Sequence, residues 1–421
     1  PQALRAAIDL GATFVAHGAQ FEKAIWWHVL ARHFVVRFRV VVNGVATREW
    51  WPMNNPPYPS NWRCTLAACA YRALPQGLDA VGDVLNLPVQ KDKRGKYLIQ
   101  RLSKRHKPSK KWPDGWVQPE GVKPKEAREA KGLLREMYHY NIVDVETENV
   151  LGKTIGELPE REQMLWELNQ AINERGVGVD LDAVDAAMEV ADKVTTELTA
   201  ELKDITGGAV ETHGQTAKIG NWINKFPSYD IPDLQADTVS DWLTGPCILD
   251  PPIRRVLEIR QTLAKSSIKK LDKIKGCVME DGRIRGMSQY HGAGTGRDAG
   301  RLVQLHNLPR PANEDINMDD LISLIKRRDA RKLEEGYGGD PMQALSDAIR
   351  GMFIAAPGNV LQVSDFSSIE ARLLAWVAGE EWKLKAFERG EDPYCLFASK
   401  AVGYNVTKKT HPKERQDIGK P

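Results

Sequence analysis

The sequence has 421 residues, 42% of them hydrophobic and 27% charged, which is the composition of a globular protein of about two to four domains. No apolar run comes close to the roughly 20 residues that span a bilayer, and no charged-then-apolar signal stands at the start of the sequence, so nothing in it suggests membrane insertion or export. The five cysteines are scattered without a C-x-x-C pair, so neither a zinc site nor a disulfide framework is predicted. We expect a monomer in a reducing cytoplasm, with no membrane partner.

The formal net charge of +3 conceals an uneven distribution of charge. Residues 91–111 carry ten Lys and Arg against the single acid Asp92, and residues 254–275 carry eight against two acids. For either run taken alone, an ordinary solvated face of the protein is about as good an explanation as a binding surface. Two such segments in a nearly neutral protein nevertheless predict a polyanionic partner, and nucleic acid is the first candidate.

The first 150 residues mix helical and strand patterns. A helix, a short strand at 13–17 and a second helix come first, and segment 33–51 alternates Val with polar residues around an Asn-Gly pair, which predicts two strands joined by a turn. Helical patterns return at 64–72 and 125–151. Between them, the Pro- and Gly-rich stretch 107–126 predicts an exposed loop.

The pattern is mostly helical from 160 to 275, with an interruption at 174–180 and a long helix at 181–204 that a Gly-Gly pair would end. Short strand-like pieces rich in glycine follow at 282–297. The segment 379–421 is helical and polar. The chain begins without Met and stops at Pro421, so we expect both ends to be cut from a longer protein.

A carboxylate, Asp365, follows the apolar run 360–363, which predicts a short buried strand. Ser367 and Glu370 have the spacing of a capping box. The helix that they would begin has an apolar stripe of Ile369, Leu373, Trp376 and Val377. Asp365 therefore lies in a strand-to-helix turn, where it could hold a hard cation through oxygen or simply cap the helix.

Three segments resemble the family A DNA polymerases in the order in which that family has them. The string SDFSSIEAR at 364–372 resembles motif A, GAGTGRDAGRLVQLHNLPRP at 292–311 resembles the segment before it, and 379–403 resembles the fingers segment after it. The resemblance implies that Asp365 and the backbone carbonyl of Phe366 bind two magnesium ions that align a primer 3′-hydroxyl with a deoxynucleoside triphosphate.

The same resemblance assigns binding residues. Glu370 would pack near the sugar 2′ position, where it disfavours ribonucleotides, and Arg297 would contact the primer strand. Segment 254–275 looks like the thumb helix that follows primer-template DNA through sequence-independent phosphate contacts, with Lys265 among them. Three further candidates for contacts with the duplex are Gln304, His306 and Asn307, of which His306 stands where the family usually has Gln.

The last eleven residues, HPKERQDIGKP, resemble the start of motif B, whose Lys contacts the incoming triphosphate. Lys420 is the matching residue. The family usually has an Arg four residues earlier, but Gln416 stands there and Arg415 lies one residue before it.

Two further segments, 14–26 and 137–151, resemble motifs of the 3′–5′ exonuclease domain that is fused to these polymerases. Tyr140 and Asp144 have the family's spacing on one helical face, so Asp144 would bind metal and Tyr140 would orient the attacking water. Glu22 stands where the family usually has a metal-binding Asp, and Gly18 stands where Asn is expected. An ordinary amphipathic helix would also explain Tyr140 and Asp144.

The fold expected from these matches is α/β plus α+β. It consists of a ribonuclease-H-like 3′–5′ exonuclease domain without its first strands, a helical thumb, a palm that contains motif A, and partial fingers that end in motif B. The boundaries expected for these four parts are 1–152, 153–276, 277–378 and 379–421.

The expected function is template-directed DNA synthesis with Mg²⁺, primer-template DNA and deoxynucleoside triphosphates, in a bacterial host cell if the gene is from a phage. The first exonuclease motif and polymerase motif C are not in the sequence, so we expect the 421-residue chain alone to be inactive. Two alternatives stay open. The protein could be a relative of the single-subunit RNA polymerases, or a DNA-binding remnant without catalysis.

Overall fold

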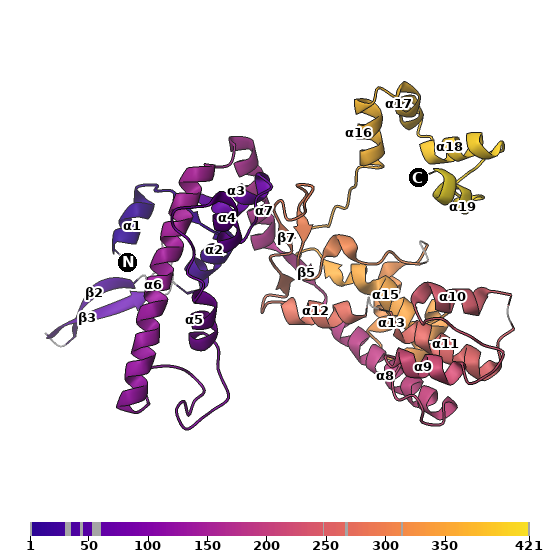
Figure 1. Cartoon of the computed structure of the whole chain (residues 1–421), viewed down its shortest axis with the longest axis horizontal. Helices are drawn as coiled ribbons and strands as arrows, with labels where there is room; N and C mark the ends of the chain where they lie inside the picture. The colour runs from indigo at the N-terminus through magenta and orange to yellow at the C-terminus, as the bar shows by residue number, and fades with distance from the viewer. Residues whose placement is uncertain are drawn as a thin grey trace. The chain divides into compact units, whose positions relative to one another are not determined.

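A computed structural model describes residues 2–29, 35–42, 45–52, 60–246, 248–265, 268–312 and 315–419 (Figure 1). The chain divides into two compact units, Pro1–Ala356 and Pro357–Pro421, and each is described by itself. Both helices and strands are present, and the strands are short. None of the helices in these residues is both long and apolar enough to cross a bilayer.

The first part of the larger unit combines short strands with helices. Strand β1 pairs in parallel with β4, and β2 pairs with β3 as an antiparallel hairpin, which confirms the strand pair predicted for 33–51. The Asn-Gly turn of that hairpin lies outside the described residues. The elements are α1 (Gln2–Asp9), β1 (Phe14–Ala16), α2 (Ala19–His28), β2 (Val35–Val42), β3 (Val45–Pro52), β4 (Trp62–Cys64), α3 (Thr65–Tyr71), α4 (Leu78–Leu85), α5 (Gly95–Leu102) and α6 (Pro124–Ile155).

The loop between α5 and α6 differs from the prediction of an exposed loop. Its Trp112 and Val117 are buried against Leu98 of α5 and Leu133 of α6. The Pro- and Gly-rich composition correctly indicated the absence of a helix, but it does not report on side chains that fold back. Two apolar anchors therefore attach this loop to the helices on either side.

A helical region follows, and its apolar faces form the main core. It contains α7 (Glu160–Arg175), β5 (Val177–Val179), α8 (Leu181–Ile205), α9 (Thr216–Ile223), α10 (Ala236–Thr244), α11 (Pro251–Leu263) and α12 (Lys269–Cys277). Helix α8 ends as predicted, because Gly208 adopts a φ of 80° and its N–H donates to the carbonyl of Lys203.

The basic helix predicted over 254–275 is two helices, α11 and α12. The chain leaves α11 at Lys265, whose ammonium lies 2.7 Å from a carboxylate oxygen of Asp340 and 2.9 Å from the amide oxygen of Gln343. Each of the two helices then buries its own apolar face, with Ile259 in one and Ile274 in the other. This long-range tie to residues 340–343 is not visible in the local periodicity.

The rest of the larger unit surrounds a small antiparallel sheet in the order β6-β5-β9. Strand β5 pairs with β6 through Val177 and Ile284, and with β9 through Val179 and Phe353. The elements are β6 (Arg283–Ile284), β7 (Ser288–Gln289), β8 (Ala299–Gly300), the 3₁₀ turn η2 (Leu305–Asn307), α13 (Met318–Ile325), α14 (Ala330–Tyr337), α15 (Pro341–Ala348), the 3₁₀ turn η3 (Ile349–Met352) and β9 (Phe353–Ile354).

The smaller unit is helical, and its first residues differ from the prediction. Residues 360–363 are not a strand, and Val360 and Val363 are 80% and 93% exposed. A strand needs a neighbour to satisfy its backbone groups, and the described part of this unit offers none. The helices are α16 (Ile369–Val377), α17 (Glu381–Glu388), α18 (Pro393–Val402) and α19 (Pro412–Glu414), followed by a π-helical turn at Arg415–Gly419.

The predicted capping box is also absent. Ser368, not Ser367, is the N-cap of α16, in a left-handed conformation with φ 52°, and its side chain makes no capping hydrogen bond. The apolar stripe of α16 faces outward, since Trp376 and Val377 are 70% and 76% exposed. Sequence spacing correctly predicted that these residues share a helical face, but it does not show whether anything packs on that face.

Candidate active site and nucleic-acid interface

Helix α6 presents a row of polar side chains at intervals of four residues: Tyr140, Asp144 and Glu148. Tyr140 is buried, and burial together with its hydrogen bond to Asp144 raises the pKa of its hydroxyl. One oxygen of Asp144 lies 3.7 Å from the ammonium of Lys91, and the other is buried without a hydrogen-bond partner. The spacing on which the sequence prediction rested is therefore present in the fold.

The sequence analysis missed two residues here, Glu148 of this row and His17, and Thr65 connects them. The imidazole of His17 lies 2.9 Å from both the Thr65 hydroxyl and the Gln76 carbonyl. The Thr65 hydroxyl is also 3.5 Å from a carboxylate oxygen of Glu148. Two signals in the sequence could have identified these residues: a His next to Gly18, and a Glu one helical turn after Asp144.

The donor and acceptor roles in this chain of contacts follow from chemistry. The Gln76 carbonyl can only accept, so Nε2 of His17 carries a proton. Burial lowers the pKa of His17, and a neutral imidazole then accepts the Thr65 proton at Nδ1. Burial, with contributions from Glu22 and Asp144, raises the pKa of Glu148 to about 7, and the Thr65 hydroxyl opposes this rise when it turns toward the Glu148 carboxylate and donates to it at 3.5 Å.

This raised pKa predicts a pH-dependent stability. Glu148 has a higher pKa when folded than the ordinary value of 4.5 for a glutamate, so its contribution to stability is complete below about pH 4.5 and is lost as the pH rises through about 7. Glu148→Gln removes the titration, and because the side chain is partly solvated we expect it to gain only about 1–2 kcal/mol relative to wild type between pH 4.5 and 8.

Urea unfolding at several pH values measures this effect, and Glu146→Gln, at an exposed position of the same helix, is the matched control. A Glu148→Gln protein whose stability changes with pH as steeply as that of wild type would rule out the raised pKa.

The fit of this site to magnesium is partial. Three features fit the binding of a cation: the unpartnered oxygen of Asp144, the raised pKa of Glu148 and the nearby charge of Glu22. However, no group of three or more potential metal-ligating side chains occurs among the residues that the structure describes. Gly18, at the Asn position, has a φ of 99° and begins α2 without a side chain to contribute.

In the smaller unit, Asp365, Phe366 and Glu370 are exposed. Asp365 and Phe366 precede α16, and Glu370 is in its first turn. Arg372 fixes this turn, because its guanidinium donates to the Ser367 carbonyl at 2.8 Å and lies 4.4 Å from the ring centre of Phe387. Lys420 lies outside the described residues, so the structure does not test its proximity to Asp365.

The end of the chain has a different arginine arrangement from the one expected of motif B. Arg415 lies 2.6 Å from the carboxylate of Asp392 and 5.3 Å from the ring centre of Tyr394. These two residues begin α18, so Arg415 ties the last turn to that helix. Gln416, at the usual Arg position, is exposed.

In the larger unit, the predicted duplex contacts lie on one hairpin and the turn that follows it. Arg297 is exposed between β7 and β8, and η2 carries His306 and Asn307 on the surface. Gln304 has a left-handed φ of 55° and accepts a 2.8 Å hydrogen bond from the Asn307 amide. The Lys270 ammonium donates to the Asn307 carbonyl at 2.6 Å, which joins the basic segment to this turn.

The cations of segment 254–275 are mostly engaged inside the protein. Ion pairs join Arg255 to Glu201, Lys265 to Asp340 and Lys275 to Asp185. Arg254, Arg260 and Lys270 donate to backbone carbonyls. Within the described residues, Lys269 and Lys273 have neither kind of partner, so the charge available to a phosphate backbone is smaller than the sequence count indicates.

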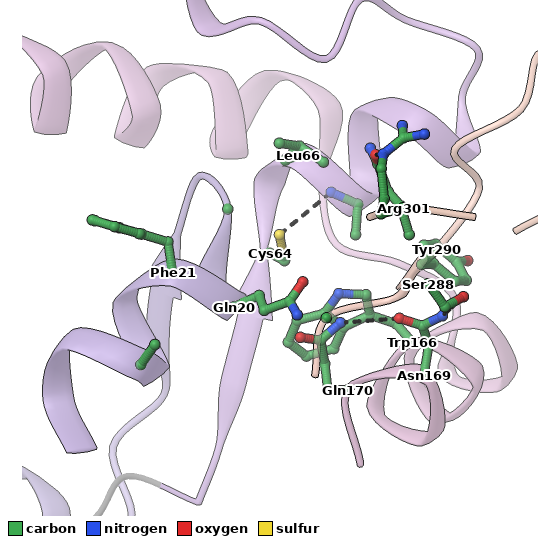
Figure 2. A pocket seen from close by; sticks show the side chains of 15 residues that line it. Gln20, Phe21, Cys64, Leu66, Trp166, Asn169, Gln170, Ser288, Tyr290 and Arg301 are labelled. Carbon is green, nitrogen blue, oxygen red and sulfur yellow. Dashed lines mark hydrogen bonds between the residues drawn. The ribbon is translucent and has the colours of Figure 1, made fainter. Parts of the chain in front are cut away.

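A cavity of about 480 Å³ lies elsewhere in the larger unit, between α2, α3, α7 and the β7–β8 hairpin (Figure 2). Phe21, Leu66 and Trp166 give it an apolar lining. Gln170 reaches it from α7, donates to Asn169 at 3.3 Å and keeps a buried carbonyl oxygen without a partner. None of the predicted catalytic residues lines this cavity, so it is separate from the carboxylates of α6.

The sequence comparisons with known proteins find DNA polymerases. Residues 237–420 match the model of DNA polymerase family A. The chain is 38% identical to the DNA polymerase of Bacillus phage SP02 over 78% of its own length and 49% of that protein. It is 22% identical to DNA polymerase I of Lactococcus lactis over 63% of its own length and 28% of that protein.

A solved structure, the polymerase domain of Pol1 from M. smegmatis in complex with DNA primer-template and dNTP, is 18% identical with a TM-score of 0.45, over 86% of this chain and 53% of that one. The chain spans about half the length of its SP02 relative. The family that these comparisons support for residues 237–420 is therefore DNA polymerase family A.

Proposed function

We propose that this chain takes part in template-directed DNA synthesis, in which a nucleotide is transferred to the 3′-hydroxyl of a DNA primer. The observation that carries the proposal is the family A match over residues 237–420, a range that contains Arg297, Asp365 and Glu370. The substrates are primer-template DNA and deoxynucleoside triphosphates. The RNA polymerase alternative receives no support from the relatives, which are DNA polymerases.

In this proposal Asp365 holds magnesium together with the carbonyl of Phe366. Asp365 offers a hard oxygen ligand at an exposed position, and the described part of the chain gives it no ion pair, which fits a cation of this type. Magnesium, when bound, neutralises charge on the oxygens of the phosphoryl group. Glu370 and Lys420 select and hold the nucleotide, and Arg297, Gln304, His306 and Asn307 hold the duplex. Lys265, which the sequence also suggested for the duplex, is instead paired with Asp340.

We also propose that residues 1–152 are an exonuclease-type domain with Tyr140, Asp144 and Glu22 at its site. The one-turn spacing of Tyr140 and Asp144 on α6 and the buried, unpartnered oxygen of Asp144 support this assignment. The thumb at 153–276, the palm at 277–378 and the start of the fingers at 379–421 complete the proposed organisation. The protein would act as a monomer in the host cytoplasm.

A primer-extension assay tests the polymerase proposal. The protein to assay is the full-length product of the coding sequence that contains these residues. We expect Mg²⁺-dependent addition of the deoxynucleotide that is complementary to the template. Preference for ribonucleotides would favour the RNA polymerase alternative. Duplex binding without any extension would favour a DNA-binding remnant.

A further inference from the structure

The basic segment 91–111 differs from the thumb segment in how its charges are used. Ion pairs join Lys91, Arg94 and Lys111 to carboxylates of α6, and Arg105 donates to a backbone carbonyl. Among the described residues, the other six cations of the segment have no carboxylate or hydrogen-bond partner: Lys93, Lys96, Arg101, Lys104, Lys107 and Lys110. A concentration of unneutralised positive charge therefore remains on α5 and the loop after it.

This charge is carried by a fixed scaffold. Trp112 and Val117 anchor the loop in the same apolar cluster as Leu98 of α5. A backbone hydrogen bond of 2.7 Å joins the His106 N–H to the Gly115 carbonyl. Gly115 has a φ of 76°, and a Cβ there would meet the carbonyl oxygen of His106 at 2.3 Å, so only glycine fits this turn. A surface fixed before binding loses less conformational entropy when a ligand arrives.

Two aromatic rings are exposed among these cations. Tyr97 is 51% exposed on α5, and Trp116 is 40% exposed in the loop, although its neighbour Trp112 is buried. Exposed rings beside a basic track suit unpaired bases, which stack on aromatic faces while their phosphates meet cations. Paired bases in a duplex do not present their faces in this way.

We propose that α5 and residues 103–123, here called the platform, bind single-stranded DNA independently of its sequence. The platform is fixed beside the carboxylate row of α6, because a Cβ at Gly95 would lie 2.0 Å from the ring of Tyr140, and Trp112 belongs to the same cluster as Tyr140. A strand on the platform therefore passes next to Tyr140 and Asp144. The identity of that strand as a polymerase substrate rests on the proposed function, whereas its binding does not.

Fluorescence anisotropy of the 421-residue chain with a labelled oligothymidine of about 16 nucleotides tests the proposal. The test variant is Lys104→Gln/Lys107→Gln/Lys110→Gln. The control is Lys153→Gln/Lys203→Gln/Lys225→Gln, which removes the same charge from other exposed positions. We expect the test variant to bind about tenfold more weakly at low salt, with the slope of log affinity against log salt reduced by about 2.

The aromatic contribution is measured separately. We expect Trp116→Ala to weaken oligothymidine binding by about fivefold or more, with little change for a blunt duplex of the same length. An equal loss for duplex and single strand would overturn the specificity for single strands.

Equal oligothymidine affinities of the two triple variants would overturn the platform itself. So would platform-dependent binding of a polyglutamate peptide without binding of DNA, since the partner would then be an acidic protein segment. Failure of the proposed polymerase function has a different signature: primer extension is absent, while oligothymidine binding still depends on Lys104, Lys107 and Lys110.

Discussion

Asp365→Ala is expected to reduce primer extension by about a thousandfold or more while the affinity for duplex DNA changes little. Removing a metal ligand removes several kcal/mol of charge stabilisation in the transition state, and each 1.36 kcal/mol is a factor of ten in rate. Duplex affinity depends instead on phosphate contacts along the DNA, which this substitution leaves in place. Single-turnover extension and a duplex-binding assay on the full-length protein measure the two effects.

Glu381→Ala is the matched control, because Glu381 is also an exposed carboxylate close to the start of a helix of the smaller unit. We expect this variant to extend a primer at a rate close to that of wild type. Loss of duplex affinity in Asp365→Ala equal to the loss of extension would mean that Asp365 supports DNA binding, not catalysis.

Asp347→Ala is expected to destabilise the larger unit by about 3–5 kcal/mol. Asp347 has no exposed surface, and it accepts hydrogen bonds from the Ala312 N–H at 2.9 Å, the Tyr337 hydroxyl at 2.9 Å and the Gln343 amide at 2.6 Å. Alanine would leave three donors without an acceptor in a buried site. Urea unfolding followed by tryptophan fluorescence measures the change.

Two further substitutions, both expected to cost less stability than Asp347→Ala, serve as comparisons. Asp320→Ala removes an exposed carboxylate from the first turn of α13 and should cost less than about 1 kcal/mol. Tyr337→Phe removes one of the three hydrogen bonds to Asp347 and should cost about 1 kcal/mol. A cost for Asp347→Ala no larger than that for Tyr337→Phe would contradict the view that the three bonds act as one buried network.

The sequence was sufficient for elements whose signals are local. Periodicity predicted α6 and α8, and a glycine pair marked the end of α8 correctly. Alternation of Val with polar residues predicted the β2–β3 hairpin. In each case the information lies between residues a few positions apart, which interact in the same way in almost any surrounding fold.

Predictions that needed a distant partner did worse. The apolar run 360–363 has strand composition, but the strand of this region is β9, at residues 353–354, because β5 is available there to pair with it. The basic helix 254–275 breaks where Lys265 meets Asp340. Both outcomes depend on residues far away in the sequence, which a local pattern does not contain.

The sequence by itself was sufficient for the resemblance to family A, the positions of Asp365, Tyr140 and Asp144, and where positive charge concentrates, because motif spacing and composition are properties of the chain. Only the tertiary structure decided which charges remain available. Asp185 of α8 and Asp340, the N-cap of α15, neutralise Lys275 and Lys265, whereas Lys104 and Lys107 stay unpaired on an anchored loop. It also brought His17 to Thr65 and Thr65 to Glu148, contacts that close over 48 and 83 residues of chain and are set by how whole elements pack.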